Sequence, residues 1–327
     1  MIATTTVRVQ AVRSTPRSDR PPLSPGPRRA SRAWRRNAPL LVLLIPGLAY
    51  FLIFRIWPMW GAQIAFRDYV PFLGIEGSPW VGWKHFELFF SNPDFPRLLV
   101  NTLVIAGLSL FVAFPLTIVV AILLNELRLT VLKRTVQTLI YIPHFLSWTV
   151  VVSLTALLFS LGTGPLAALL DGVLGETTNY LASPFWFRPL ILLQEVWKNT
   201  GWGTIIFLAA LASVDQEQYE AAIIDGAGRW QRVRHITLPS ISSTIIVMLI
   251  LQSGQILNTG FEQIYLMSNA LNRSVADVFD TYVYFTGIEQ GAYSYSTAVG
   301  LAKAIVGVIL VFGTNWLAKR FNQTGIF

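Results

Sequence analysis

The chain contains no cysteine and little charge. Of its 327 residues 13% are charged and 53% are hydrophobic, whereas a soluble globular domain carries about 25% charged residues. The absence of cysteine excludes disulfides, thiolate metal sites and cysteine nucleophiles. So few charges cannot cover the surface of a soluble protein of this length. The composition therefore predicts an all-α protein embedded in a lipid bilayer.

Common catalytic motifs are also missing. The sequence has no G-x-x-x-x-G-K-[ST] run, no H-E-x-x-H and no G-x-S-x-G, which argues against a P-loop, a zinc protease and a serine hydrolase. Its three histidines, His85, His144 and His235, are expected in three different compartments, so they predict no shared metal site. We therefore expect no catalytic residue and no cofactor in this chain.

The basic residues are concentrated near the start of the sequence. The net charge of +8 first suggests nucleic acid as a partner. Residues 1–37, however, hold nine arginines and one acidic residue, and the remaining chain is balanced, with 16 basic and 16 acidic side chains. This segment is rich in proline and serine, so we expect a disordered cytoplasmic tail against anionic lipid rather than a nucleic-acid-binding surface.

Six segments are long and apolar enough to cross a bilayer, which takes roughly 20 residues. They are residues 40–66, 98–124, 135–160, 189–211, 241–258 and 295–316. Residues 164–174 are apolar but too short to span. With the amino terminus inside, the cytoplasmic side receives 17 Lys and Arg residues and the outer side six, so both termini are expected in the cytoplasm. The first span is expected to be a retained anchor rather than a cleaved signal peptide.

The cytoplasmic loop 212–240 carries the most informative motif. It reads QYEAAIIDGAGRWQRVRHITLP from Gln218 to Pro239. EAAII favours a short helix, the two glycines of DGAG interrupt it and permit a positive φ, and WQRVRHITL favours a second short helix. Pro239 suits the first turn of the fifth span because its missing N–H costs little there. The sequence therefore predicts a helix–turn–helix at the membrane surface, with a shape that fits a groove on another protein.

EAA-x-x-DGA followed by ITLP resembles the EAA loop of ABC-importer permeases. In that family the first helix of this loop is the coupling helix, which seats in a cleft of the ATPase. The resemblance assigns ATPase coupling to Glu220, Ala221, Ala222, Asp225, Gly226, Ala227 and Gly228. Other stretches, including VQTLIYIPHF and GFEQIYLMSNAL, resemble the aldouronate, complex-polysaccharide and alginate-oligosaccharide permeases. This likeness covers residues 38–327, with Val233 departing mildly from an aromatic that many sugar permeases have.

The resemblance implies a type I importer permease fold in the cytoplasmic (inner) membrane. It also implies a second homologous permease, a dimer of ABC ATPases that binds ATP and Mg²⁺, and an extracytoplasmic solute-binding protein that delivers an oligosaccharide. Uronate-bearing sugars such as alginate or aldouronate fragments are candidate substrates. Two outer loops, residues 67–97 and 259–293, are rich in aromatic residues. They are expected to form an interfacial belt or a docking surface for the binding protein.

Polar residues inside the spans are candidates for the substrate path, because polar groups at membrane depth are costly and mark cavities or helix partners. The candidates are Glu195, Trp197, Lys198, Asn199, Gln252, Gln255, Asn258, Tyr295 and Lys303. Glu195 and Lys198 are spaced to pair on one helix face, and Lys303 could neutralise a uronate. The alternative is structural: an ion pair, glutamines that bridge helices, and a salt bridge to the partner subunit.

Two other classes of function compete with the importer hypothesis. An ion-coupled secondary sugar transporter would show internal hydropathy symmetry and no ATPase-docking loop. A membrane-embedded enzyme would need catalytic carboxylates or a His/Ser pair near one membrane face. The EAA-like loop argues against the first, and no such cluster supports the second.

Overall fold

The computed structural model describes residues 42–320, so the expected basic tail 1–37 lies outside the described residues. The chain divides into two units, Met1–Trp60 and Gly61–Phe327, and each is treated by itself. The described residues of the first unit belong to the helix Val42–Phe66. This helix becomes a π-helix at η1 (Leu52–Ile56) and a 3-10 helix at η2 (Trp57–Phe66). Pro58 lacks the N–H that α-helical bonding would need at the start of η2.

Helices joined by short irregular connections make up the described residues of the second unit, and one isolated β-bridge pairs Arg67 with Trp80. On the predicted outer side it has short helices: η3 (Pro71–Leu73), α2 (Gly74–Gly77), α3 (Lys84–Phe90), α8 (Pro165–Leu174), α14 (Phe261–Met267), α15 (Arg273–Ala276), α16 (Phe279–Tyr284) and η7 (Phe285–Glu289). α8 is the short apolar helix expected at residues 164–174.

The second predicted span is one continuous helical segment, Phe95–Glu126. It consists of α4 (Phe95–Leu108), the π-helical turn η4 (Ser109–Ala113) and α5 (Phe114–Glu126). Pro115 has no N–H to donate to the preceding turn, and a π-turn before it accommodates that loss without breaking the helix.

The third predicted span, residues 135–160, is not one straight helix. α6 (Thr130–Tyr141) continues into η5 (Ile142–Phe145), and α7 (Trp148–Leu158) follows at 103° to that helix. Pro143 lies in η5, and the extended Ser147 caps α7 by accepting a hydrogen bond from the Val150 N–H at 3.3 Å. A proline and a strong N-cap so close together end one helix and start another.

The fifth predicted span, residues 241–258, is also shorter and bent. Pro239 lies in α12 (Leu238–Ser240) rather than opening the span, and α13 (Ser242–Gly254) follows after a bend of 60°. The helix ends at Gly254, so the last residues of the predicted span form a turn. Apolar composition alone cannot locate such a break in the backbone.

Within residues 42–320, three helices are apolar and long enough to cross a membrane, or up to five if each bent pair counts as one span. The first is Val42–Phe66, the second Phe95–Glu126 and the third Tyr293–Trp316, within α17 (Tyr293–Arg320). The fourth predicted span corresponds to α9 (Pro184–Ala212), whose 29 residues suffice in length. Its charged side chains, among them Glu195 and Lys198, lower its apolar character.

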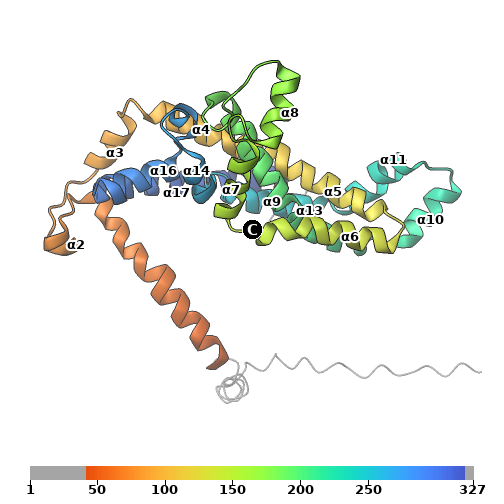
Figure 1. Ribbon diagram of the computed structural model, residues 1–327. Helices are drawn as coiled ribbons and strands as arrows, with labels where there is room; N and C mark the ends of the chain where they lie inside the picture. The colour runs from red at the N-terminus through yellow and green to blue at the C-terminus, as the bar shows by residue number, and fades with distance from the viewer. Residues whose placement is uncertain (1–41, 321–327) are drawn as a thin grey trace, which may run out of the picture. The chain divides into compact units, whose positions relative to one another are not determined.

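α9 packs against α5 and α6 and lies within the second unit (Figure 1). A core of buried residues including Ile105, Phe159, Tyr180, Phe187 and Ile264 surrounds its first half, and a second core around Phe207 and Leu211 surrounds its last turns. Figure 1 shows α10 and α11 beyond the ends of α5 and α6, and α3 at the opposite end. The loop that carries α10 and α11 therefore lies at the opposite end of this unit from α3.

Candidate functional site

A polar cavity of about 250 Å³ lies among four segments of the second unit. Its wall comes from α4 and η4, from α9, from Trp148 at the start of α7, and from the chain between the end of α13 and the start of α14. The lining residues are Ile105, Ala106, Ser109, Leu110, Trp148, Glu195, Asn199, Gln252, Gln255, Ile256, Asn258, Thr259, Gly260 and Gln263. Amide, hydroxyl and carboxyl groups thus face one space inside an otherwise apolar unit.

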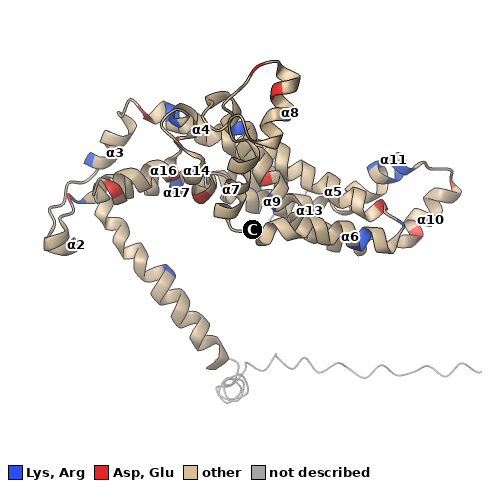
Figure 2. Ribbon diagram, viewed as in Figure 1, with Lys and Arg blue, Asp and Glu red and all other residues tan. Residues whose placement is uncertain are grey.

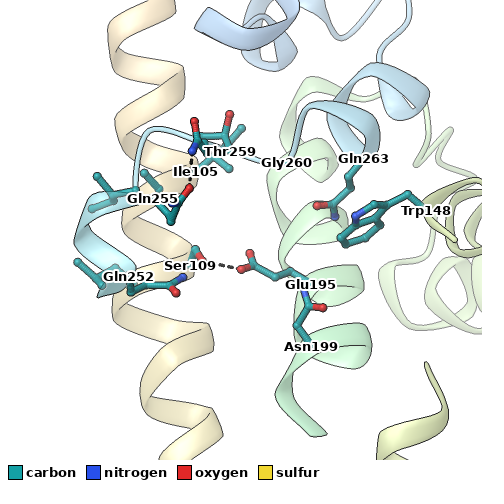
Figure 3. A pocket seen from close by; sticks show the side chains of 14 residues that line it. Ile105, Ser109, Trp148, Glu195, Asn199, Gln252, Gln255, Thr259, Gly260 and Gln263 are labelled. Atoms are coloured by element: carbon teal, nitrogen blue, oxygen red, sulfur yellow. Dashed lines mark hydrogen bonds between the residues drawn. The ribbon is translucent and has the colours of Figure 1, made fainter. Parts of the chain in front are cut away.

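A hydrogen bond crosses this cavity between two helices. Ser109 Oγ donates to Glu195 Oε1 at 2.5 Å, and Figure 3 shows the two side chains pointing toward each other from η4 and α9. Ser109 begins the π-turn, and an extra residue in a helical turn re-aims the side chains next to it. Ser109 was not predicted as a path residue, because a single serine in an apolar run does not indicate a binding site by itself.

Three predicted path residues line the opposite wall, but not as a continuous helical stripe. Gln252 lies on α13, whereas Gln255 and Asn258 follow the end of the helix. Asn258 Nδ2 donates to Gln255 Oε1 at 2.5 Å, which holds the turn. Gly260 has φ +76°, a left-handed conformation that favours glycine, and it starts α14.

The floor of the cavity next to α14 is a buried amide pair. Gln263 Nε2 donates to Gln194 Oε1 at 2.9 Å and to the Ile191 carbonyl at 2.8 Å. Gln194 Nε2 in turn donates to Thr155 Oγ1 at 2.8 Å. These bonds tie α7, α9 and α14 together behind the cavity. Gln263 was not predicted as a path residue, because hydropathy places it in a loop outside the predicted spans.

Lys198 does not pair with Glu195. The Lys198 ammonium donates to the carbonyls of His144 and Leu146 and lies 5.3 Å from the ring centre of Trp148. Those carbonyls are free of helical partners because the backbone breaks between α6 and α7. The expected i, i+3 ion pair was wrong for this reason: the 103° bend offers Lys198 two acceptors that sequence spacing cannot reveal.

The remaining predicted path residues lie away from this cavity. Trp197 is 46% exposed and Tyr295 packs among outer aromatics. Lys303 forms an ion pair with Asp280, so it is a structural cation within this chain and not a free charge for a uronate. The structure therefore places Glu195, Asn199, Gln252, Gln255 and Asn258 in the wall of this cavity and the other four outside it, although Lys303 lines a second cavity together with Asn258.

The outer end is held by polar contacts between distant segments. Asn92 Nδ2 donates to the hydroxyls of Tyr282 at 2.9 Å and Tyr295 at 3.0 Å. Burial, reinforced by the Tyr295 hydroxyl, raises the pKa of Tyr282. Lys84 Nζ donates to Asp68 Oδ2 at 2.7 Å, and this bond holds the pKa of Asp68 below its ordinary value.

Loop 212–240, which was predicted to be cytoplasmic, folds as two short helices with a glycine turn. α10 (Gln216–Ile224) begins at Asp215, whose Oδ1 accepts from the Glu217 N–H at 2.9 Å. After the helix, Gly226 has φ +79°. α11 (Arg229–Arg232) continues through η6 (Val233–Thr237) into α12. The predicted helix–turn–helix is confirmed, and it starts earlier than expected.

The two arms of this loop are fixed to each other and expose a mixed surface. The Tyr219 hydroxyl lies 3.0 Å from Thr237 Oγ1, which joins α10 to η6. Ile224 is 85% exposed and Trp230 is 74% exposed. Figure 2 shows acidic residues on α10 and basic residues on α11. Large apolar side chains flanked by both charge signs are typical of a protein-docking surface.

Residues 113–323 match the family model described as the binding-protein-dependent transport system inner membrane component. The chain is 61% identical to "Protein LplB" of Bacillus subtilis (strain 168), over 90% of this chain and 93% of that protein. It is 54% identical to the "Polygalacturonan/rhamnogalacturonan transport system permease protein YteP" of the same organism, over 88% and 90% of the two chains.

Two solved structures have the same fold. A chain of a "bacterial ABC transporter involved in the import of the acidic polysaccharide alginate" matches with a TM-score of 0.82 and 36% identity, over 89% of this chain and 99% of that one. A chain of the alginate transporter "in complex with alginate pentasaccharide-bound periplasmic protein" matches with a TM-score of 0.84 and 36% identity, over 91% and 100%. The chain belongs to the family of inner-membrane permease components of binding-protein-dependent ABC transport systems.

Proposed function

We propose that this chain is one of two permease subunits that form the path of an oligosaccharide importer driven by a partner ATPase. The observation that carries the proposal is the polar cavity between η4, α9 and the end of α13, which lies in the same helical unit as the exposed α10–α11 loop. Sugars are bound by amide, hydroxyl and carboxyl groups beside an aromatic ring, and Asn199, Gln252, Glu195 and Trp148 supply these. Acidic oligosaccharides are the substrate class that the names of the relatives support.

In this proposal the chain spans the cytoplasmic membrane six times, with both termini inside. α9 is the fourth span, with its charged residues turned to the cavity or to broken backbone, which is where such residues are tolerated in a membrane. ATP and Mg²⁺ are bound by the partner ATPase, and its closure is passed to the spans through α10. The spans then rock around the cavity, which gives alternating access.

Transport by the complete importer tests this function. The permease pair, the ATPase and the cognate binding protein are reconstituted, and uptake of oligosaccharides is measured together with ATP hydrolysis. We expect binding protein with sugar to stimulate hydrolysis, and Gln252→Ala to reduce uptake. Uptake that follows an ion gradient and persists without the ATPase would instead favour the secondary transporter.

The topology has its own test, because the sequence contains no cysteine and any introduced thiol is unique. We expect a membrane-impermeant maleimide to label Glu87→Cys on intact spheroplasts. Gln218→Cys, on α10, should react only after the membrane is opened. Equal labelling of both positions from outside would contradict the proposed orientation.

A further inference from the structure

The wall of the cavity contains one ionisable side chain. Among the described residues that line it, Glu195 alone carries an acidic or basic group, and the other polar members are amides and hydroxyls. A sugar carboxylate is held best by a cation together with converging N–H donors. The lining has amide N–H donors, such as those of Asn199, Gln252 and Gln255, but it has no cation and places the Glu195 carboxyl group beside them.

The two lysines among the predicted path residues both bind other groups of this chain. Lys198 donates to the His144 and Leu146 carbonyls behind Trp148, and Lys303 is paired with Asp280. Moving either ammonium into the cavity would leave buried acceptors without a donor, which costs more than an ordinary hydrogen bond returns. Neither lysine is therefore available as a counter-charge for a bound sugar.

Ser109 occupies the place that a sugar hydroxyl would take. Its hydroxyl donates to Glu195, so the Glu195 carboxyl group has a hydrogen-bond donor from this chain itself. A sugar hydroxyl can replace that donor with the same geometry, while Asn199 lies beside Glu195 on α9 and Gln252 lies on the opposite wall (Figure 3). A carboxylate cannot, since it has no hydrogen to donate.

We propose that this subunit's wall selects an uncharged sugar unit through Glu195 and disfavours a unit that carries a carboxylate. This inference rests on the proposed function. Glu195 accepts a hydrogen bond in this structure, and as a carboxylate it accepts from a sugar hydroxyl and repels a sugar carboxylate. An acidic oligosaccharide would then place its carboxylates against the other parts of the path, with the hydroxyl face of a sugar against this chain.

The test compares two probes that differ only in charge, a galacturonate trisaccharide and its fully methyl-esterified form. Uptake of each is measured with the complete reconstituted importer carrying wild-type permease, Glu195→Gln or Glu195→Lys. The binding protein is the same throughout, so changes in the ratio of acid to ester uptake report on the permease. We expect the ratio to rise from wild type to Glu195→Gln, and by about tenfold or more in Glu195→Lys.

Glu87→Lys is the matched control, since it makes the same charge reversal at an exposed position on α3 and should leave the ratio unchanged. A ratio that is the same in wild type and both Glu195 variants overturns the inference, as does a fall in Glu195→Lys. If wild-type importer transports neither probe, the proposed function fails for this class of sugar. The inference is then decided by equilibrium binding of galacturonate and its methyl ester to the solubilised complex, where a wild-type preference for the acid overturns it.

Discussion

The contact between α9 and α6 gives the sharpest test of the packing that positions the cavity. Gly201, in α9, faces the backbone of α6 so closely that an added Cβ would overlap the Ile140 carbonyl. The two backbones would have to separate by more than about 1 Å to reach the ~3.5 Å of an ordinary contact. Gly201 is two residues beyond Asn199 and six beyond Glu195, so this separation would also move the cavity wall.

The expected cost of Gly201→Ala follows from two opposing terms. Overpacking a close contact costs about 1–3 kcal/mol, and the upper end applies because the neighbouring atoms are backbone. Alanine in place of glycine within a helix returns up to about 1 kcal/mol. We therefore expect a net loss of about 2 kcal/mol. This should appear as a lower unfolding temperature of the solubilised complex and as reduced uptake.

Two other glycines calibrate this measurement. At Gly203 an added Cβ would lie 2.8 Å from Thr117 Cγ2, a side chain that can move, and at Gly172 in α8 nothing lies within 4 Å. The unfolding temperatures should rank Gly172→Ala highest, Gly203→Ala next and Gly201→Ala lowest. A Gly201→Ala complex as stable and as active as wild type would refute the close packing of α9 on α6.

Three further perturbations test other parts of the molecule. Lys198→Met removes both hydrogen bonds at the bend between α6 and α7, and each such bond contributes about 1.5–3 kcal/mol. Part of this loss is offset because the variant no longer has to desolvate an ammonium group on folding. We therefore expect thermal unfolding to show a loss of about 2 kcal/mol in stability, and no change for Lys319→Met at an exposed position. The pKa of Asp68 is lowered in the folded protein, so the stability that its carboxylate contributes is present above its unfolded pKa of about 3.9 and is lost as the pH falls through the lower folded pKa. The difference in unfolding temperature between wild type and Asp68→Asn should therefore shrink across that acid range. A difference that stays constant with pH would contradict this. Gly226→Val places a β-branched residue at φ +79° at a cost of about 1–2 kcal/mol and should abolish sugar-stimulated ATP hydrolysis, whereas Gly226→Asn should retain much of it.

The sequence predicted local features better than it predicted the cavity. The α10–α11 loop depends on residues within a short stretch, namely the Asp215 cap and the Gly226 turn, so its pattern could be recognised directly. The positions of Ser109 and Lys198 depend on a π-turn and on a 103° bend, which hydropathy does not encode. The five predicted residues that do meet at the cavity come from α9 and the end of α13, where polar side chains in an apolar run were the signal.

Three irregular stretches of backbone meet at the cavity. The π-turn η4 presents Ser109, the break before α7 presents Trp148, and the chain from Gly254 to Gly260 presents the amides of the opposite wall. In a membrane, interrupted helices are tolerated only where they are buried in protein or face a water-filled space, because lipid offers no partner to free N–H and C=O groups. Three interruptions around one polar space are difficult to explain as accidents of packing. They are what a substrate path at membrane depth requires, and this supports placing the selective wall of the importer at Glu195.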